Sequence, residues 1–245
     1  MSSHRALRTR LSAMMFLQYA IWGAWLPLLW PFLSNHRGFT GDQIGHMFMV
    51  GAAGAIVAPW LAGQIADRYF ATEKFLAISH LVGGVLVWRL ASVESYGAFM
   101  AFSLVYSLIY SPTLSLTNSI SFAHLPDRDR DFGHVRVWGT VGWIVVGIAI
   151  GQWLLHHHTP ADASAEAQRA AQSAGMADAF RLSAVLGIML GLYCLTLPHT
   201  PPSKGLHANA TCGSDGGDPP QPLAHAVPAG CSDQLHPPVL LRPHR

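Results

Sequence analysis

The sequence predicts an all-α membrane protein with six transmembrane helices and a disordered C-terminal tail. Of its 245 residues, 51% are hydrophobic and only 11% are charged, and the apolar residues come in long blocks, as is typical of membrane proteins. Several tryptophans stand near the ends of these blocks, where an indole ring prefers the headgroup level. The formal net charge of +2 is too small to indicate a nucleic-acid surface.

Six apolar blocks are long enough, at roughly 20 residues, to cross a bilayer as helices. The first contains Pro27 and Pro31, is long and lacks a clear cleavage site, so we interpret it as a retained helix and not a signal peptide. Small residues recur on the fifth block, which predicts close helix packing. The polar connection 156–178 predicts an outer loop with room for a short surface helix. The six blocks lie near residues 11–33, 44–66, 75–93, 97–122, 135–155 and 180–198.

The basic residues predict the orientation of these spans. Cytoplasmic loops of membrane proteins carry an excess of lysine and arginine. The richer side therefore lies in the cytoplasm, and both termini with it. That side carries Arg5, Arg8, Arg10, Arg68, Lys74, Arg128, Arg130 and Lys204, and the other carries Arg37, Arg89, Arg169 and Arg181.

The composition changes abruptly after Pro202. Residues 203–245 contain no Ile, Phe, Tyr, Trp, Met or Glu and are crowded with Pro, Gly and His. Such a segment cannot bury enough apolar surface to fold, so we expect disorder. We therefore divide the chain into a helical bundle, 1–202, and a tail, 203–245. The composition of the tail also suits the out-of-frame translation of a GC-rich gene.

The loop after the second block, GQIADRYFATEK from Gly63 to Lys74, carries a recognisable pattern. It resembles, in degenerate form, the signature between the second and third helices of the major facilitator superfamily. Gly63, Asp67 and Arg68 match, while Phe70 and Ala71 stand where glycine and arginine are usual. An ordinary charged loop is the alternative interpretation.

Four further stretches narrow the resemblance: MFLQYAIWGAWLPLL, SPTLSLTNSISF, RVWGTVGW and CLTLPHTP. Together, in this order and spacing, they resemble the nucleoside:proton symporter family of the major facilitator superfamily, in its N-terminal half only. The resemblance implies one six-helix half of a transporter of the bacterial inner membrane. It also implies a nucleoside substrate, with a proton as the coupling ion if a second half is present. No carboxylate falls in the middle of a predicted span, so the coupling acid would belong to that second half.

Arg136, Thr140 and Trp143 recur at i, i+4 and i+7, so they form one stripe on a helix. An arginine is costly in lipid and tends to face a cavity or a partner. The stripe offers hydrogen bonds for ribose and base and a flat ring for stacking, which is what a nucleoside needs. By resemblance, these three residues bind the nucleoside. The alternative for Arg136 is that its side chain extends to the headgroups.

Gln18 and Trp22, one helical turn apart on the first block, are the other candidates for substrate binding. An amide inside hydrocarbon needs a partner, which is either a neighbouring helix or the transported solute. His80 is expected near a membrane interface, and the histidine run 156–158 is expected to begin a polar loop. We identify no metal site, no cofactor and no enzyme motif.

Two functional hypotheses of different classes remain. One is a nucleoside carrier that acts with a second half, or the same kind of carrier for another small polar solute such as a sugar. The other is an inactive membrane fragment.

Overall fold

The computed structural model of this protein describes residues 2–68 and 71–201, and all regular elements within these stretches are helical. This confirms the predicted fold class. The tail, residues 203–245, and the side chains of Asp67 and Arg68 lie outside the described part of the chain. The disorder predicted for the tail and the role predicted for the signature around Asp67 and Arg68 therefore stay predictions.

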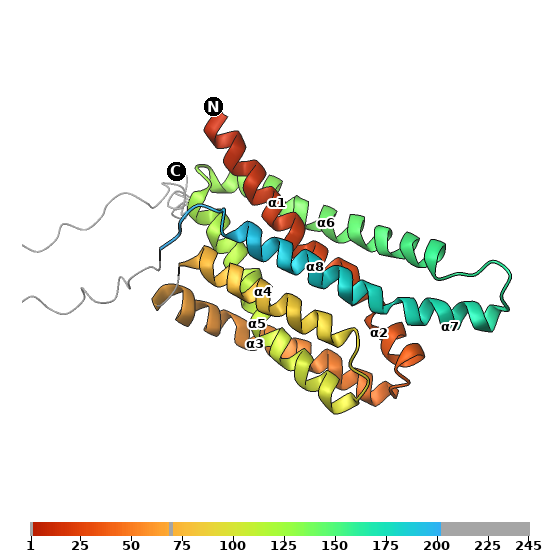
Figure 1. The fold of residues 1–245 in the computed structure, drawn as a ribbon. Helices are drawn as coiled ribbons and strands as arrows, with labels where there is room; N and C mark the ends of the chain where they lie inside the picture. The colour runs from red at the N-terminus through yellow and green to blue at the C-terminus, as the bar shows by residue number, and fades with distance from the viewer. Residues whose placement is uncertain (1, 69–70, 202–245) are drawn as a thin grey trace, which may run out of the picture. The chain divides into compact units, whose positions relative to one another are not determined.

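Within the described residues, six long helices correspond to the six predicted blocks, and their arrangement is seen in Figure 1. Five helical segments in the described part are long and apolar enough to cross a membrane. The sixth helix, α4, has 19 residues, or roughly 29 Å at 1.5 Å per residue, but carries Glu73, Lys74 and Arg89 at its ends. The long helices are α1 (Ser2–Trp25), α3 (Gly41–Arg68), α4 (Thr72–Leu90), α5 (Tyr96–His124), α6 (Arg128–His157) and α8 (Ala177–Cys194).

Prolines divide the end of the first block into short pieces. The chain passes from α1 through a 3-10 turn, η1 (Leu26–Leu28), into α2 (Leu29–Pro31) and then a π-helical turn, η2 (Phe32–His36). Proline lacks the N–H that a continuing α-helix would use, so Pro27 and Pro31 explain why α1 does not continue. In the connection between α6 and α8, α7 (Ala165–Gly175) is capped by Ser164, whose hydroxyl accepts a hydrogen bond from the Ala167 amide.

The helices follow a simple order of neighbours. α1 packs against α6 and α8, α4 packs against α8 and α5, and α5 packs against α3. Thus α3 and α6 stand at the two ends of this order, each with one main neighbour (Figure 1). The arrangement brings the start of α1 beside the start of α6, although the two are more than 100 residues apart in the sequence.

Glycines bring α1 and α6 into unusually close contact. A Cβ atom on Gly142 would collide with the Phe16 carbonyl, and one on Gly23 would lie 2.6 Å from the Trp143 carbonyl. Backbone atoms cannot swing aside as a flexible side chain can. These two positions therefore require glycine for the helices to approach this closely.

α5 contains Pro112 and several hydroxyl groups that return to their own helix. Thr113 donates to the Tyr110 carbonyl, Thr117 to the Leu114 carbonyl and Ser121 to the Thr117 carbonyl. Hydroxyls inside hydrocarbon find acceptors in this way without leaving their helix. The polar face of α5 is thus compatible with a membrane span.

Glu73 ties the segment after α8 to the start of α4. Its carboxylate accepts a hydrogen bond from the Thr200 amide at 3.0 Å and lies 2.7 Å from Nδ1 of His199. Glu73 precedes the apolar stretch that begins at Phe75 and lies outside it. Burial raises the pKa of this carboxyl, but the hydrogen bonds from Thr200 and His199 outweigh it and hold the pKa below its ordinary value.

Candidate functional site

The predicted stripe on α6 meets the aromatic face of α1. The guanidinium carbon of Arg136 lies 4.1 Å from the centre of the Tyr19 ring, a cation–π distance. About two turns further along α6, the rings of Trp143 and Trp22 meet edge to face, with centroids 6.4 Å apart and an interplanar angle of 89°. Arg136 and Trp143 are both partly buried, whereas Thr140 is exposed.

Gln18 occupies a buried position between α1 and α5. Its Nε2 donates to Oγ1 of Thr113 at 2.9 Å, so the interhelical role left open by the sequence is present. Its Oε1 is buried and has no hydrogen-bond partner among the described residues. The amide thus keeps one acceptor free one helical turn before Trp22.

The structure unites some of the predicted residues and leaves others apart. Trp22 contacts Trp143 directly, and its ring centre lies 5.3 Å from that of Tyr110 on α5. Arg136 reaches α1 at Tyr19, three residues before Trp22. Thr140 makes no side-chain hydrogen bond within the described residues.

A cavity of about 230 Å³ lies beside Trp22, between α1, α3 and α5. Aromatic rings and aliphatic side chains dominate its wall, and hydroxyl groups supply the polar part. This mixture is typical of small-molecule sites. The lining includes Trp22, Trp25, Met47, Phe48, Ser103, Tyr106, Ser107, Tyr110 and Ser111.

Our sequence analysis missed the contribution of α5 to this cavity. Ser103, Ser107 and Ser111 recur every four residues, as do Tyr106 and Tyr110, so both sets follow one face of the helix. The repeat was visible in the sequence SLVYSLIYS. The sequence alone does not assign this face to a cavity, because that depends on which helices pack against α5.

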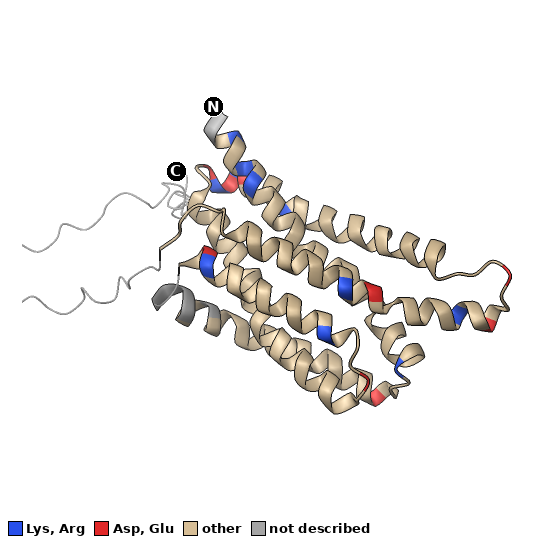
Figure 2. Ribbon diagram, in the orientation of Figure 1, with Lys and Arg blue, Asp and Glu red and all other residues tan. Residues whose placement is uncertain are grey.

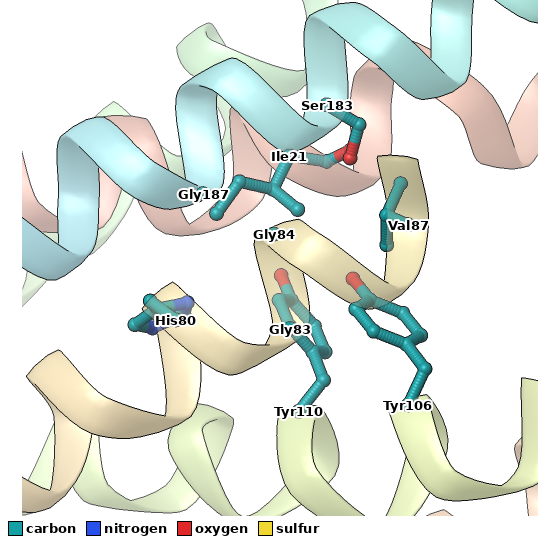
Figure 3. A pocket seen from close by; sticks show the side chains of 9 residues that line it. All are labelled: Ile21, His80, Gly83, Gly84, Val87, Tyr106, Tyr110, Ser183 and Gly187. Atoms are coloured by element: carbon teal, nitrogen blue, oxygen red, sulfur yellow. The ribbon is translucent and has the colours of Figure 1, made fainter. Parts of the chain in front are cut away.

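A second, much smaller cavity of about 10 Å³ lies on the other side of the tyrosines, against α4 and α8 (Figure 3). Tyr106 and Tyr110 line both cavities, and their rings stack with centroids 5.2 Å apart. His80 lines the small cavity and is only 2% exposed. Our expectation that His80 lies near a helix end is wrong, because α4 runs from Thr72 to Leu90 and places His80 in its middle, with the ring against Tyr110 of α5. The space would hold about one water molecule, so it is not a substrate site.

Comparison with known proteins places this arrangement in a family. The family model described as nucleoside H+ symporter matches residues 5–213. The chain belongs to the nucleoside H+ symporter family. This confirms the resemblance drawn from the four sequence stretches.

Individual relatives in the nucleoside H+ symporter family agree with this placement. The putative nucleoside transporter YegT of Escherichia coli is 40% identical over 201 residues, which cover 80% of this chain and 43% of YegT. The xanthosine permease of Escherichia coli is 36% identical over 155 residues, or 62% of this chain and 37% of the permease. The crystal structure of the nucleoside transporter NupG (D323A mutant) superimposes with a TM-score of 0.70 and 30% identity, covering 84% of this chain and 47% of that one.

The chain thus spans less than half the length of the nucleoside H+ symporter relatives that it matches. It is a multi-pass membrane protein of a transporter family. Its six long helices correspond to one half of such a transporter, as the sequence predicted.

Proposed function

We propose that this chain is the N-terminal half of a nucleoside permease of the bacterial inner membrane, with both termini in the cytoplasm. It acts as a carrier and not as an enzyme. Transporters of this type work by rocking two six-helix halves about a site at the midplane. Transport coupled to protons therefore requires a second half.

The contact between Trp22 and Trp143 carries this proposal. Two indole rings from different helices, with Tyr110 behind them, provide a stacking surface for a nucleobase. The hydroxyls of Ser103, Ser107 and Ser111 line the adjoining cavity. Ser107 donates to the Gly51 carbonyl and keeps its acceptor capacity, while Ser103 and Ser111 offer both donors and acceptors to a ribose. A stacking surface next to hydroxyl groups matches the two parts of a nucleoside.

The other predicted residues have supporting roles in this proposal. Arg136, held against Tyr19, supplies a fixed positive charge and hydrogen-bond donors at the cytoplasmic side of the stacking surface. Gln18 offers its free Oε1 to the substrate. Thr140, exposed on α6, binds the nucleoside from the same wall once the second half encloses it.

Uptake of radiolabelled uridine and adenosine tests the carrier function. Two proteins are compared in cells that lack their own nucleoside permeases: this chain alone, and this chain joined to the second half of NupG. We expect uptake from the joined protein and none above background from the chain alone. A joined protein that reaches the membrane in normal amounts and takes up neither nucleoside would contradict the proposal.

Trp143→Ala in the joined protein tests the stacking role. Loss of one base–aromatic contact costs about 1–3 kcal/mol, so we expect nucleoside affinity to fall at least five-fold. Trp143→Phe keeps a ring and should retain most of the affinity. Trp60→Ala is the control, because Trp60 is an exposed tryptophan of α3 outside the cavity lining. If Trp143→Ala and Trp60→Ala behave alike, Trp143 does not stack on the substrate.

Sugar transport is a second candidate, because the maltose permease of Geobacillus stearothermophilus is 25% identical over 142 residues, covering 58% of this chain. Competition between labelled uridine and an excess of unlabelled maltose decides between them. We expect unlabelled adenosine to compete and maltose not to compete.

A further inference from the structure

A groove at the start of α1 and α6 lies apart from the candidate substrate site. It has a volume of about 380 Å³ and is lined by Arg5, Arg8, Thr9, Ser12, His134 and Trp138. Arg5, Arg8 and Ser12 follow one face of α1, and His134 and Trp138 are one turn apart on α6. Figure 2 shows charged residues gathered where these two helices begin.

The chemistry of this groove suits an anion that carries several oxygen atoms. Two guanidinium groups, the Ser12 hydroxyl, an imidazole and an indole carry donors, while the Thr9 hydroxyl donates to the Arg5 carbonyl at 3.0 Å. No carboxylate is among the residues that line it in the described part of the chain. The nearby acid, Asp131, forms an ion pair with Arg8 at 3.3 Å, which links α1 to α6 at one side of the groove. Arg5 is exposed. A phosphate group is the ligand that such a set of donors recognises best.

The groove continues into an apolar surface on the same face of α6. Trp138 is 48% exposed, Val145 is 49% exposed and Ile148 is 60% exposed, and their spacing places them along one side of the helix. In a chain that spans a membrane, such a surface meets acyl chains. The groove and the surface together match a lipid with a charged head and a long apolar chain.

The face of α6 that carries the groove is not the face that carries the proposed substrate stripe. His134 and Trp143 differ by nine positions, which at 100° per residue places them about 180° apart around the helix. The groove therefore does not depend on the proposed nucleoside site.

We propose that this groove binds the phosphate headgroup of an anionic phospholipid, with an acyl chain along the exposed side of α6. Arg5 and Arg8 attract the phosphate, and the Ser12 hydroxyl and the His134 ring donate hydrogen bonds that orient it. The indole of Trp138 lies at the boundary between headgroup and acyl chain, a position that tryptophan prefers. The bound lipid bridges α1 and α6 at their shared end.

The test uses the full chain in detergent and three probes: phosphatidylglycerol, phosphatidylcholine and inorganic phosphate. Thermal unfolding followed by tryptophan fluorescence measures stabilisation. We expect phosphatidylglycerol to raise the unfolding temperature at concentrations where phosphatidylcholine has no effect. Stabilisation by inorganic phosphate at those same concentrations would show a site for free anions and overturn the lipid assignment. Equal stabilisation by both lipids would also overturn it.

Matched variants locate the effect. Arg5→Gln leaves the Arg8–Asp131 pair intact and should weaken phosphatidylglycerol binding about five-fold, as expected for one arginine near a membrane surface. Arg5→Gln combined with Ser12→Ala should weaken it further. Arg89→Gln removes an equal charge from an exposed position at the end of α4, at the opposite end of the bundle, and should leave the stabilisation unchanged. Unchanged binding in the double variant would place the lipid elsewhere and disprove the proposal.

Discussion

At the scale of residues, Trp22 belongs to two groups of contacts at once. It meets Trp143 of α6 on one side and lines the larger cavity with α5 on the other. The sequence placed Trp22 and Trp143 on helix faces by their spacing. It could not show that the two faces meet, because that depends on which helices pack together.

Other residues show where spacing alone is insufficient. Gln18 needed a partner by the rules of polar groups in membranes, and its bond to Thr113 links positions 95 residues apart that no local pattern connects. His80 differs from its prediction because α4 begins at Thr72, before the apolar block, so His80 stands in the middle of the helix and not near its end.

Glu73 gives a prediction that depends on pH. Glu73→Gln should lower the stability of the chain at neutral pH by about 1 kcal/mol, because the hydrogen bonds from Thr200 and His199 lose a charged acceptor. A carboxyl whose pKa is lowered in the folded state contributes stability above its unfolded pKa, and this contribution disappears as the pH falls through the folded pKa.

The difference in unfolding temperature between the original chain and Glu73→Gln should therefore be largest at pH 7. It should become smaller once the pH falls below the ordinary pKa of a glutamate. Thermal unfolding across this range measures it. Glu94→Gln, at an exposed position, is the control and should show a small difference throughout. A constant difference for Glu73→Gln down to pH 3 would show that the carboxylate is not what holds the segment.

At the scale of elements, the existence and order of the long helices followed from the apolar blocks, since roughly 20 apolar residues have few other solutions in a membrane. Their ends did not. α1 and α6 begin earlier than predicted. In α1, alanine, leucine and arginine favour helix beyond the apolar region, and in α6 the Asp127 side chain caps the first turn by accepting from the Arg130 amide. The breaks at Pro27 and Pro31 were visible in the sequence, but the particular turns that follow them were not.

The contact between α1 and α6 leads to a second prediction. Gly142→Ala places a methyl group against the Phe16 carbonyl, so we expect a loss of about 1–3 kcal/mol, as for other overpacked positions. Gly151→Ala on the same helix has open space around the added Cβ and should be neutral or slightly stabilising, because alanine is the better helix former. Thermal unfolding in one detergent compares them, and equal behaviour of the two variants would show that α1 and α6 are not packed this closely.

At the scale of the whole molecule, the excess of basic residues on one side predicts that the start of the first span and the end of the sixth span both face the cytoplasm. Alkaline phosphatase, which is active only outside the cytoplasm, tests this. Fused after residue 163, in the connection before α7, it should be active, and fused after residue 201 it should be inactive. The opposite pattern would invert the topology. A fluorescent protein that folds in the cytoplasm should give the complementary result at both positions.

The way in which α5 is built has a mechanical consequence. Pro112 has no N–H to donate to the Leu108 carbonyl, so one rung of the helix is missing where the serine-lined part ends and Thr113 begins. A proline in a helix is therefore a place where the helix bends. Gln18 of α1 holds α5 on both sides of it, because its carbonyl accepts from the Tyr110 hydroxyl and its side-chain amide donates to Thr113. Any bend of α5 at Pro112 must therefore move against α1 at Gln18, which couples the width of the larger cavity to the contact between these two helices.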